Sequence, residues 1–266
     1  MIVYIKYFKL RIMTFLQYRA SAIAGLTTQF FWGMMLIFIY VAFYSTGTQV
    51  GINLEQIITY TWLHQACYAL IGVRLNDNEI ATMIRDGSVA YEIIRPYNLY
   101  FWWYIKTVAK RVASGLLRMF PVIIVALLLP ETYRLSLPSS FLNFLLFLIS
   151  LILGILLVSA INMLIYTIGF YTYNEAGISG IMYSFMELLS GGLVPVVLLP
   201  VILQKATYYL PFRLISDFPF RVYTNNIGIN EGLISLGLQI IWIVFLLFIG
   251  NLIVKKSLRK VFVQGG

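Results

Sequence analysis

Runs of apolar residues long enough to cross a lipid bilayer constrain this chain more than any other feature of its sequence. Hydrophobic residues make up 61% of the 266 residues and charged residues only 11%, whereas about a quarter of the residues in a soluble globular protein are charged. A helix of roughly 20 apolar residues spans the hydrocarbon core of a membrane. We therefore predict an all-α integral membrane protein with a single transmembrane domain over residues 1–266, rather than one or two soluble domains.

Six membrane spans fit the apolar pattern. In chain order they are predicted at residues 21–44, 56–73, 97–129, 141–169, 176–189 and 233–254. Segment 1–19 mixes basic with aromatic residues, which suits a helix lying in the headgroup zone. Segment 191–219 is interrupted by prolines and by Gly191 and Gly192, so we predict re-entrant helices before the last span. This segment is compatible with an outer gate and equally with a structural lid.

The net charge of +9 comes mostly from basic residues at alternate ends of the predicted spans. Three clusters lie at residues 1–19, 74–111 and 255–260. The exceptions are Arg134, Lys205, Arg213 and Arg221. This distribution follows the positive-inside rule, so we predict that both termini and the loop between spans two and three are cytoplasmic. Anionic lipid headgroups are the expected counter-charge, and no nucleic-acid partner is expected.

The loop between spans two and three contains a short segment with its own helix start and stop signals. Asn76 can cap the first turn, with Glu79 three residues later at capping-box spacing. Gly87 can end the helix in the left-handed conformation. The apolar face of this helix at helical spacing consists of Ile80, Met83, Ile84 and Gly87. A short capped helix with one apolar face, held between two membrane spans, predicts a docking surface for another protein.

The sequence offers little material for catalysis or metal binding. One histidine and one cysteine exclude clusters built from those ligands, and no Gly-rich phosphate loop followed by Lys-Ser or Lys-Thr is present. We therefore predict no catalytic site, no metal site and no P-loop nucleotide site in this chain. Cys67 has no partner for an intrachain disulfide and is interpreted as a small buried hydrophobe. Any energy must come from a partner or from an ion gradient.

Polar residues inside the predicted spans are the remaining signal. They share one face on each of three spans: Thr61, His64, Gln65 and Tyr68; Ser159, Asn162 and Tyr166; Tyr183, Ser184, Glu187 and Gly191. This pattern is compatible with a polar substrate path, and also with hydrogen bonds between helices. The candidates for the path are Gln65, Tyr68, Asn162, Tyr183 and Glu187. Because a carboxylate inside a membrane is costly, Glu187 is expected to face a hydrated cavity or a basic partner.

Two further stretches carry a resemblance to a known family. Residues 84–89 read Ile-Arg-Asp-Gly-Ser-Val and residues 93–96 read Ile-Ile-Arg-Pro. Together they are similar to the I-R-x-G-x-[VI] … L-x-[RK]-P stretch of a bacterial branch of the type 2 ATP-binding-cassette (ABC) transporter permeases. The order of the parts, from the interfacial helix to the re-entrant pieces before span six, also resembles that family. In this branch two small permeases pair and recruit separate ATPase subunits.

The resemblance implies that the short helix after span two is the coupling helix, which sits in a groove of the ATPase. The docking residues assigned in this way are Asn76, Asp77, Glu79, Ile80, Met83, Ile84, Arg85, Asp86 and Gly87. The expected partners are P-loop ATPase subunits, a second permease of the same or homologous sequence, and membrane lipids. ATP and Mg are expected in the ATPase partner, with no cofactor in this chain.

The function implied is that of a permease subunit of an ATP-driven transporter in a bacterial plasma membrane. It would export an amphipathic or hydrophobic molecule. Two alternatives from other classes stay open on the sequence alone. One is an ATP-independent carrier that uses Glu187 as a proton or ion relay, and the other is a structural membrane subunit without a transport path.

Overall fold

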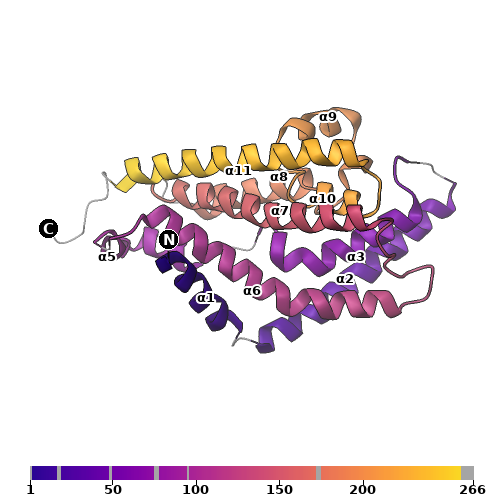
Figure 1. Ribbon diagram of the computed structural model, residues 1–266, viewed down its shortest axis with the longest axis horizontal. Helices are drawn as coiled ribbons and strands as arrows, with labels where there is room; N and C mark the ends of the chain where they lie inside the picture. Colours follow the sequence, from indigo (N-terminus) through magenta and orange to yellow (C-terminus); the bar gives the residue numbers. More distant parts are fainter. Residues whose placement is uncertain are drawn as a thin grey trace.

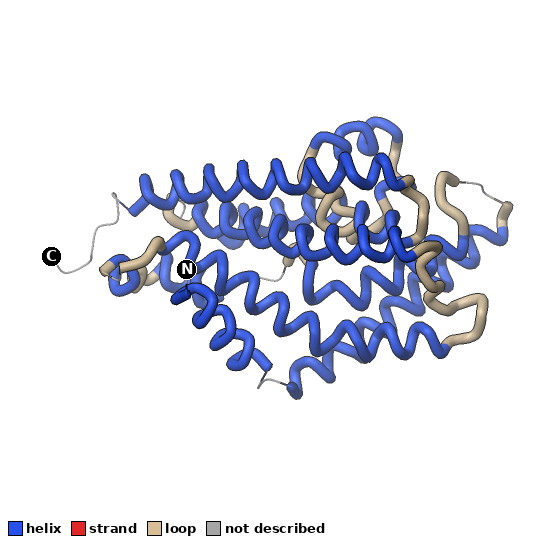
Figure 2. The backbone as a smooth tube through the Cα atoms, in the orientation of Figure 1, coloured by secondary structure: helices blue, strands red, loops and turns tan. Residues whose placement is uncertain are grey.

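The fold is a bundle of helices joined by short loops (Figure 1 and Figure 2), seen in a computed structural model of the chain. The structure describes residues 2–16, 19–47, 50–74, 78–94, 96–171 and 175–258, and these residues contain no β-strand. The helices are α1 Ile2–Leu16, α2 Arg19–Ser45, α3 Leu54–Ile71, α4 Asn78–Arg85, α5 Ala90–Ile93, α6 Leu99–Leu128, α7 Phe141–Ile168, α8 Glu175–Leu189, α9 Val201–Tyr209, α10 Asp217–Tyr223 and α11 Ile229–Leu258, with a 3₁₀ turn, η1, at Val196–Leu198. The all-α prediction is confirmed for the described residues.

Four of the described helices are long and apolar enough to cross a membrane. These spans are Gly25–Ser45 in α2, Leu99–Leu128 in α6, Phe141–Thr167 in α7 and Ile229–Leu258 in α11. The predicted second and fifth spans correspond to α3 and α8, which have 18 and 15 residues and are not among these four. The chain is thus a multi-pass membrane protein, but the count of six spans is not confirmed.

Local capping signals account for where several helices begin. The side chain of Asn53 accepts a hydrogen bond from the backbone N–H of Gln56, and the Gln56 side chain accepts one from the backbone of Asn53, so α3 starts with a complete capping box. Asn98 caps α6 and Ser140 caps α7, where the side-chain oxygen accepts from the backbone N–H of Phe101 and Asn143, respectively. Such caps satisfy backbone donors that a helix start leaves without a partner.

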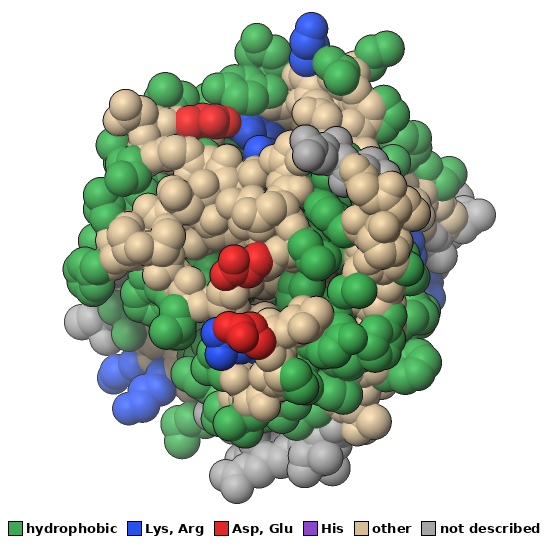
Figure 3. Space-filling model, turned by 90° about the vertical axis from the view of Figure 1, so that its right-hand side faces the viewer, with side chains coloured by type: hydrophobic (Ala, Val, Ile, Leu, Met, Phe, Trp, Pro, Cys, Tyr) green, Lys and Arg blue, Asp and Glu red, His purple; other side chains and the backbone are tan. Residues whose placement is uncertain are grey.

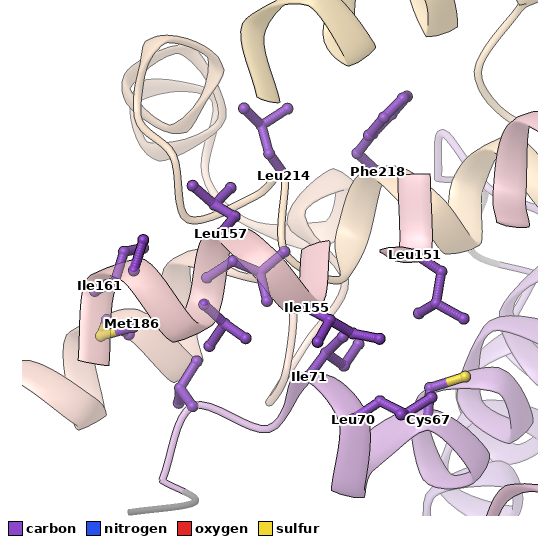
Figure 4. Packing of buried hydrophobic residues seen from close by; sticks show 14 of the residues in the cluster. Cys67, Leu70, Ile71, Leu151, Ile155, Leu157, Ile161, Met186, Leu214 and Phe218 are labelled. Carbon is purple, nitrogen blue, oxygen red and sulfur yellow. The ribbon is translucent and has the colours of Figure 1, made fainter. Parts of the chain in front are cut away.

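The long helices α6, α7 and α11 run along the molecule, and α1 lies against the outside of α6 (Figure 1). The rings of Tyr7 on α1 and Trp102 on α6 stack with centroids 3.6 Å apart. Segment 1–19 therefore contains the predicted N-terminal helix, and its position in the headgroup zone stays a prediction. The core between α3, α7, α8 and α10 is apolar, as Figure 4 shows. Cys67 is fully buried there, as the sequence predicted.

Helix α3 ends inside the bundle and does not run its full length. Its Trp62 donates a hydrogen bond to the carbonyl of Tyr133, which lies beyond the last residue of α6. At the C-terminal end of α3, Arg111 on α6 donates to the carbonyl oxygens of Leu70 at 3.2 Å and Gly72 at 2.8 Å. Arg111 lies 12 residues after Leu99, or roughly 18 Å along a helix with a rise of 1.5 Å per residue.

Helix α3, Leu54–Ile71, agrees with the predicted second span at residues 56–73 within two residues, and its crossing of a membrane stays a prediction. The last carbonyls of a helix have no partner within the helix, and inside a membrane they must be satisfied by protein or by water in a cavity. The guanidinium group of Arg111 fills that role. Figure 1 shows α3 lying beside only one part of α6. Arg111 itself is 2% exposed, and the cytoplasmic side predicted for its basic cluster stays a prediction.

Segment 191–219 folds into η1, α9 and α10 at one end of the bundle. Gly191 has φ of +83°, and its carbonyl accepts a 2.9 Å hydrogen bond from the hydroxyl of Tyr60. The carboxylate of Asp217 is fully buried and accepts a hydrogen bond from the backbone N–H of Val196 at 2.9 Å. These contacts fasten the short helices to α3. Their re-entrance into a membrane stays a prediction.

Ion pairs account for three of the basic residues that depart from the positive-inside pattern. Arg221 lies 3.4 Å from Asp217, Arg213 lies 3.9 Å from Glu231, and Arg134 lies 3.1 Å from Glu131. Figure 3 looks onto the end of the molecule where α9 and α10 lie, and shows acidic and basic side chains in small separate groups rather than in one basic patch. The pairing explains how arginines can occupy the end of the bundle predicted to be outside.

Candidate functional site

The short helix predicted between spans two and three is present as α4, Asn78–Arg85. Gly87 ends it with φ of +75°, the left-handed conformation that the sequence predicted. The backbone N–H of Ser88 donates to Asp86 at 2.9 Å, and this hydrogen bond holds the pKa of the Asp86 carboxyl below its usual value. Asn76 and Asp77 lie outside the described residues, so the predicted N-terminal cap stays a prediction.

The apolar face of α4 packs against the chain itself. Ile80 is 0% exposed and Ile84 is 9% exposed, while Met83 is partly buried against the same core. This finding corrects the expectation that these side chains are free to meet a partner. A helix of eight residues is not stable alone in water, and burial of its apolar face against the bundle holds it in place. The exposed residues are Glu79, Thr82, Arg85, Asp86 and Gly87.

Two ion pairs fasten α4 to its neighbours. The carboxylate of Glu79 lies 2.6 Å from Lys106 on α6 and 3.5 Å from Arg11 on α1. Burial of Glu79 raises the pKa of its carboxyl, but Lys106 and Arg11 outweigh that effect and hold this pKa below its usual value. A small cavity of about 60 Å³ adjoins these residues. α4 is therefore connected by charge to both the N-terminal helix and a membrane-spanning helix.

A second polar group lies where α3 has ended, and we call Arg74, Ser184 and Glu187 the inner polar site. The Nε of Arg74 donates to Oε2 of Glu187 at 2.6 Å, and Nη2 of Arg74 donates to the hydroxyl of Ser184 at 3.0 Å. Glu187 lies 12 residues after the start of α8, or roughly 18 Å along it. Arg74 lies two residues after Gly72, whose carbonyl accepts a hydrogen bond from Arg111, so the inner polar site lies close to the part of α6 around Arg111.

The five predicted path residues have different surroundings. Glu187 was expected to face either a hydrated cavity or a basic partner, and Arg74 is a basic partner. Tyr68 is close enough to interact electrostatically with Glu187 and Arg74, and Tyr183 does so with Arg111. Gln65 is buried and packs near Gly33 of α2, and Asn162 on α7 is fully buried.

The structure thus gathers Tyr68, Tyr183 and Glu187 around the end of α3, and places Gln65 against α2 instead. Sequence reasoning missed two further members of this region, Arg74 and Arg111, because it assigned both to a cytoplasmic basic cluster. One sequence signal could have found Arg111. It lies 12 residues into an apolar helix, where a cation needs a polar partner.

A bundle of long apolar helices with charged groups paired inside it defines a helical, multi-pass membrane protein. The sequence profile described as "ABC-2 family transporter protein" matches residues 30–265, and the chain belongs to this family. Membership makes it a transmembrane subunit of an ABC transporter. A comparison with curated proteins found no match.

Proposed function

We propose that this chain is the permease subunit of an ATP-driven exporter of an amphipathic or hydrophobic molecule. Membership of the ABC-2 family over residues 30–265 is the observation that carries this proposal. P-loop ATPase subunits would bind ATP and Mg, and a second permease, identical or homologous, would complete the path. The complex would lie in a bacterial plasma membrane with both termini of this chain in the cytoplasm.

The surroundings of α4 support its role as the coupling helix. Its apolar face fixes it to the bundle, and its exposed edge presents Arg85 and Asp86 to a partner. Glu79 connects the same helix to Lys106 on α6. A force that an ATPase applied to α4 would therefore reach a membrane-spanning helix through a 2.6 Å ion pair.

Exchange of Arg85 for glutamate tests the docking assignment. Arg85 is exposed, so Arg85→Glu should leave the fold intact and reverse the charge that the ATPase meets. We expect the yield of ATPase subunit co-purifying with the tagged permease to fall roughly tenfold, the loss typical of an important interface arginine. Arg134→Glu is the matched control, because Arg134 is half-exposed at the other end of the bundle. Wild-type yield with Arg85→Glu would contradict the assignment.

Cysteine labelling tests the orientation of the chain in the membrane. Leu137 is 77% exposed in the loop after α6, and Tyr91 is 74% exposed in the segment after α4. In a Cys67→Ala background, an impermeant maleimide added to whole cells should label Leu137→Cys several-fold more than Tyr91→Cys. Permeabilised cells, in which both positions should react, provide the control. Outside labelling of Tyr91→Cys with protection of Leu137→Cys would reverse the orientation and remove the docking site from the cytoplasm.

A further inference from the structure

Arg74 of the inner polar site keeps hydrogen-bonding capacity that the described part of the chain does not use. A guanidinium group has five N–H donors, and within the described residues Arg74 donates to Glu187 and Ser184. The Arg74 side chain is 50% exposed, whereas that of Glu187 is only 17% exposed. The accessible member of this ion pair is therefore the cation, and an approaching ligand meets free N–H donors rather than the carboxylate.

The depth of Arg74 makes this exposure significant. Arg74 lies two residues after Gly72, whose carbonyl accepts a hydrogen bond from Arg111, 12 residues into the candidate membrane span of α6. Charged side chains at such depth face a polar partner or a water-filled cavity, because exposure to lipid tails is costly. This chain covers only half of the Arg74 side chain, so the uncovered half faces water or a polar or anionic group from outside the chain.

Apolar side chains lie directly beside the charged groups on α8. Ile181 and Phe185 are 62% and 59% exposed, and they share a face with Ser184 at helical spacing. A ligand whose headgroup reached Arg74 could therefore lay an apolar tail along α8. Guanidinium groups recognise carboxylates and phosphates through paired hydrogen bonds, which fixes the chemistry of the headgroup.

We propose that Arg74 binds the anionic headgroup of an amphipathic substrate, and that Glu187 is the resident counter-ion that holds Arg74 when the substrate is absent. This proposal rests on the proposed transport function and names its substrate class, an amphiphile with a carboxylate or phosphate head. The headgroup and the Glu187 carboxylate compete for one guanidinium group. Removal of the Glu187 charge therefore strengthens substrate binding, and removal of the Arg74 charge weakens it.

Equilibrium binding to the purified permease in neutral detergent tests the proposal without the ATPase. The probes share a sixteen-carbon chain: radiolabelled palmitate and hexadecyl phosphate as anions, hexadecanol as the uncharged control and hexadecylamine as the cation. The wild-type chain should bind both anions in preference to the alcohol and the amine. Arg74→Gln should weaken anion binding by roughly tenfold, the effect expected when a hydrogen bond to a charged group is lost. Glu187→Gln should strengthen it several-fold.

Matched variants separate this result from a general effect on folding. Arg134 is also 50% exposed and pairs with Glu131 at 3.1 Å, so Arg134→Gln and Glu131→Gln should leave palmitate binding unchanged. A gain of affinity in Glu187→Gln cannot arise from misfolding, and Arg74→Lys, which keeps the charge, should restore part of the binding. Failure of ATPase docking in Arg85→Glu would leave these binding results unaffected, so the two proposals fail separately.

Three results would overturn the proposal. Unchanged anion binding in Arg74→Gln would remove Arg74 from the site. Equal weakening in Arg74→Gln and Glu187→Gln would make the pair a structural contact, such as part of the surface between two permeases. Displacement of palmitate by inorganic phosphate at equal concentration would show that the apolar tail is not recognised.

Discussion

Replacement of Arg111 by methionine should destabilise the chain by roughly 2–4 kcal/mol, because two buried carbonyl groups would lose their donor. The guanidinium group of Arg111 donates to the carbonyls of Leu70 and Gly72 at the end of α3. A cation at that place also interacts favourably with the negative end of the helix dipole. Methionine preserves much of the side-chain volume but can donate no hydrogen bond. The apparent unfolding temperature should therefore fall by roughly 5–10 °C.

The protein is heated and then passed through size-exclusion chromatography in detergent. The measured quantity is the fraction that stays monodisperse. Arg134→Met is the matched control. Arg134 is half-exposed and pairs with Glu131, which is 87% exposed, and such a surface pair contributes at most about 1 kcal/mol. The apparent unfolding temperature of Arg111→Lys should lie between those of the wild type and Arg111→Met, since a lysine keeps the charge but has a different reach. Equal thermal stability of Arg111→Met and the wild type would mean that α3 does not need this donor.

The parts of the fold that the sequence predicted well depend on local signals. The predicted spans 97–129 and 141–169 match α6, Leu99–Leu128, and α7, Phe141–Ile168, within two residues. Each helix begins at a capping side chain, Asn98 or Ser140, and runs through apolar sequence. α4 was likewise predicted from its spacing and from Gly87. These features are contained within a few neighbouring residues, so a single sequence reveals them.

The parts that could not be predicted depend on contacts between distant segments. The donor that satisfies the carbonyls at the end of α3 is Arg111, which lies about 40 positions later in the chain. An apolar stripe on α4 predicts that Ile80 and Ile84 are buried, but it cannot say whether another protein or the same chain buries them. The cost of a carboxylate inside a membrane predicts that Glu187 has a partner, but does not identify Arg74, 113 positions earlier.

Asp217 is the second residue whose loss should have a large effect, because one buried carboxylate joins three segments. Its Oδ1 accepts hydrogen bonds from the backbone N–H of Val196 at 2.9 Å and from the hydroxyl of Tyr60 at 3.4 Å. Its Oδ2 lies 3.4 Å from Arg221. The Asp217 side chain is fully buried. Water therefore would not replace these bonds if the carboxylate were removed.

Asp217→Ala should therefore destabilise the chain by roughly 3–5 kcal/mol, the cost of removing one partner of a buried ion pair. Asp217→Asn should cost less, because an amide oxygen can still accept from Val196, while Tyr60→Phe should cost about 1 kcal/mol for its hydrogen bond to Gly191. Glu131→Ala, at an exposed ion pair, is the control and should have little effect. Heating followed by size-exclusion chromatography measures all four variants.

This order of losses would favour a structural lid for segment 191–219, since a gate that opens must break these contacts in each cycle. If Asp217→Ala were as stable as Glu131→Ala, the carboxylate would not hold this segment closed, and a gate would be the better interpretation.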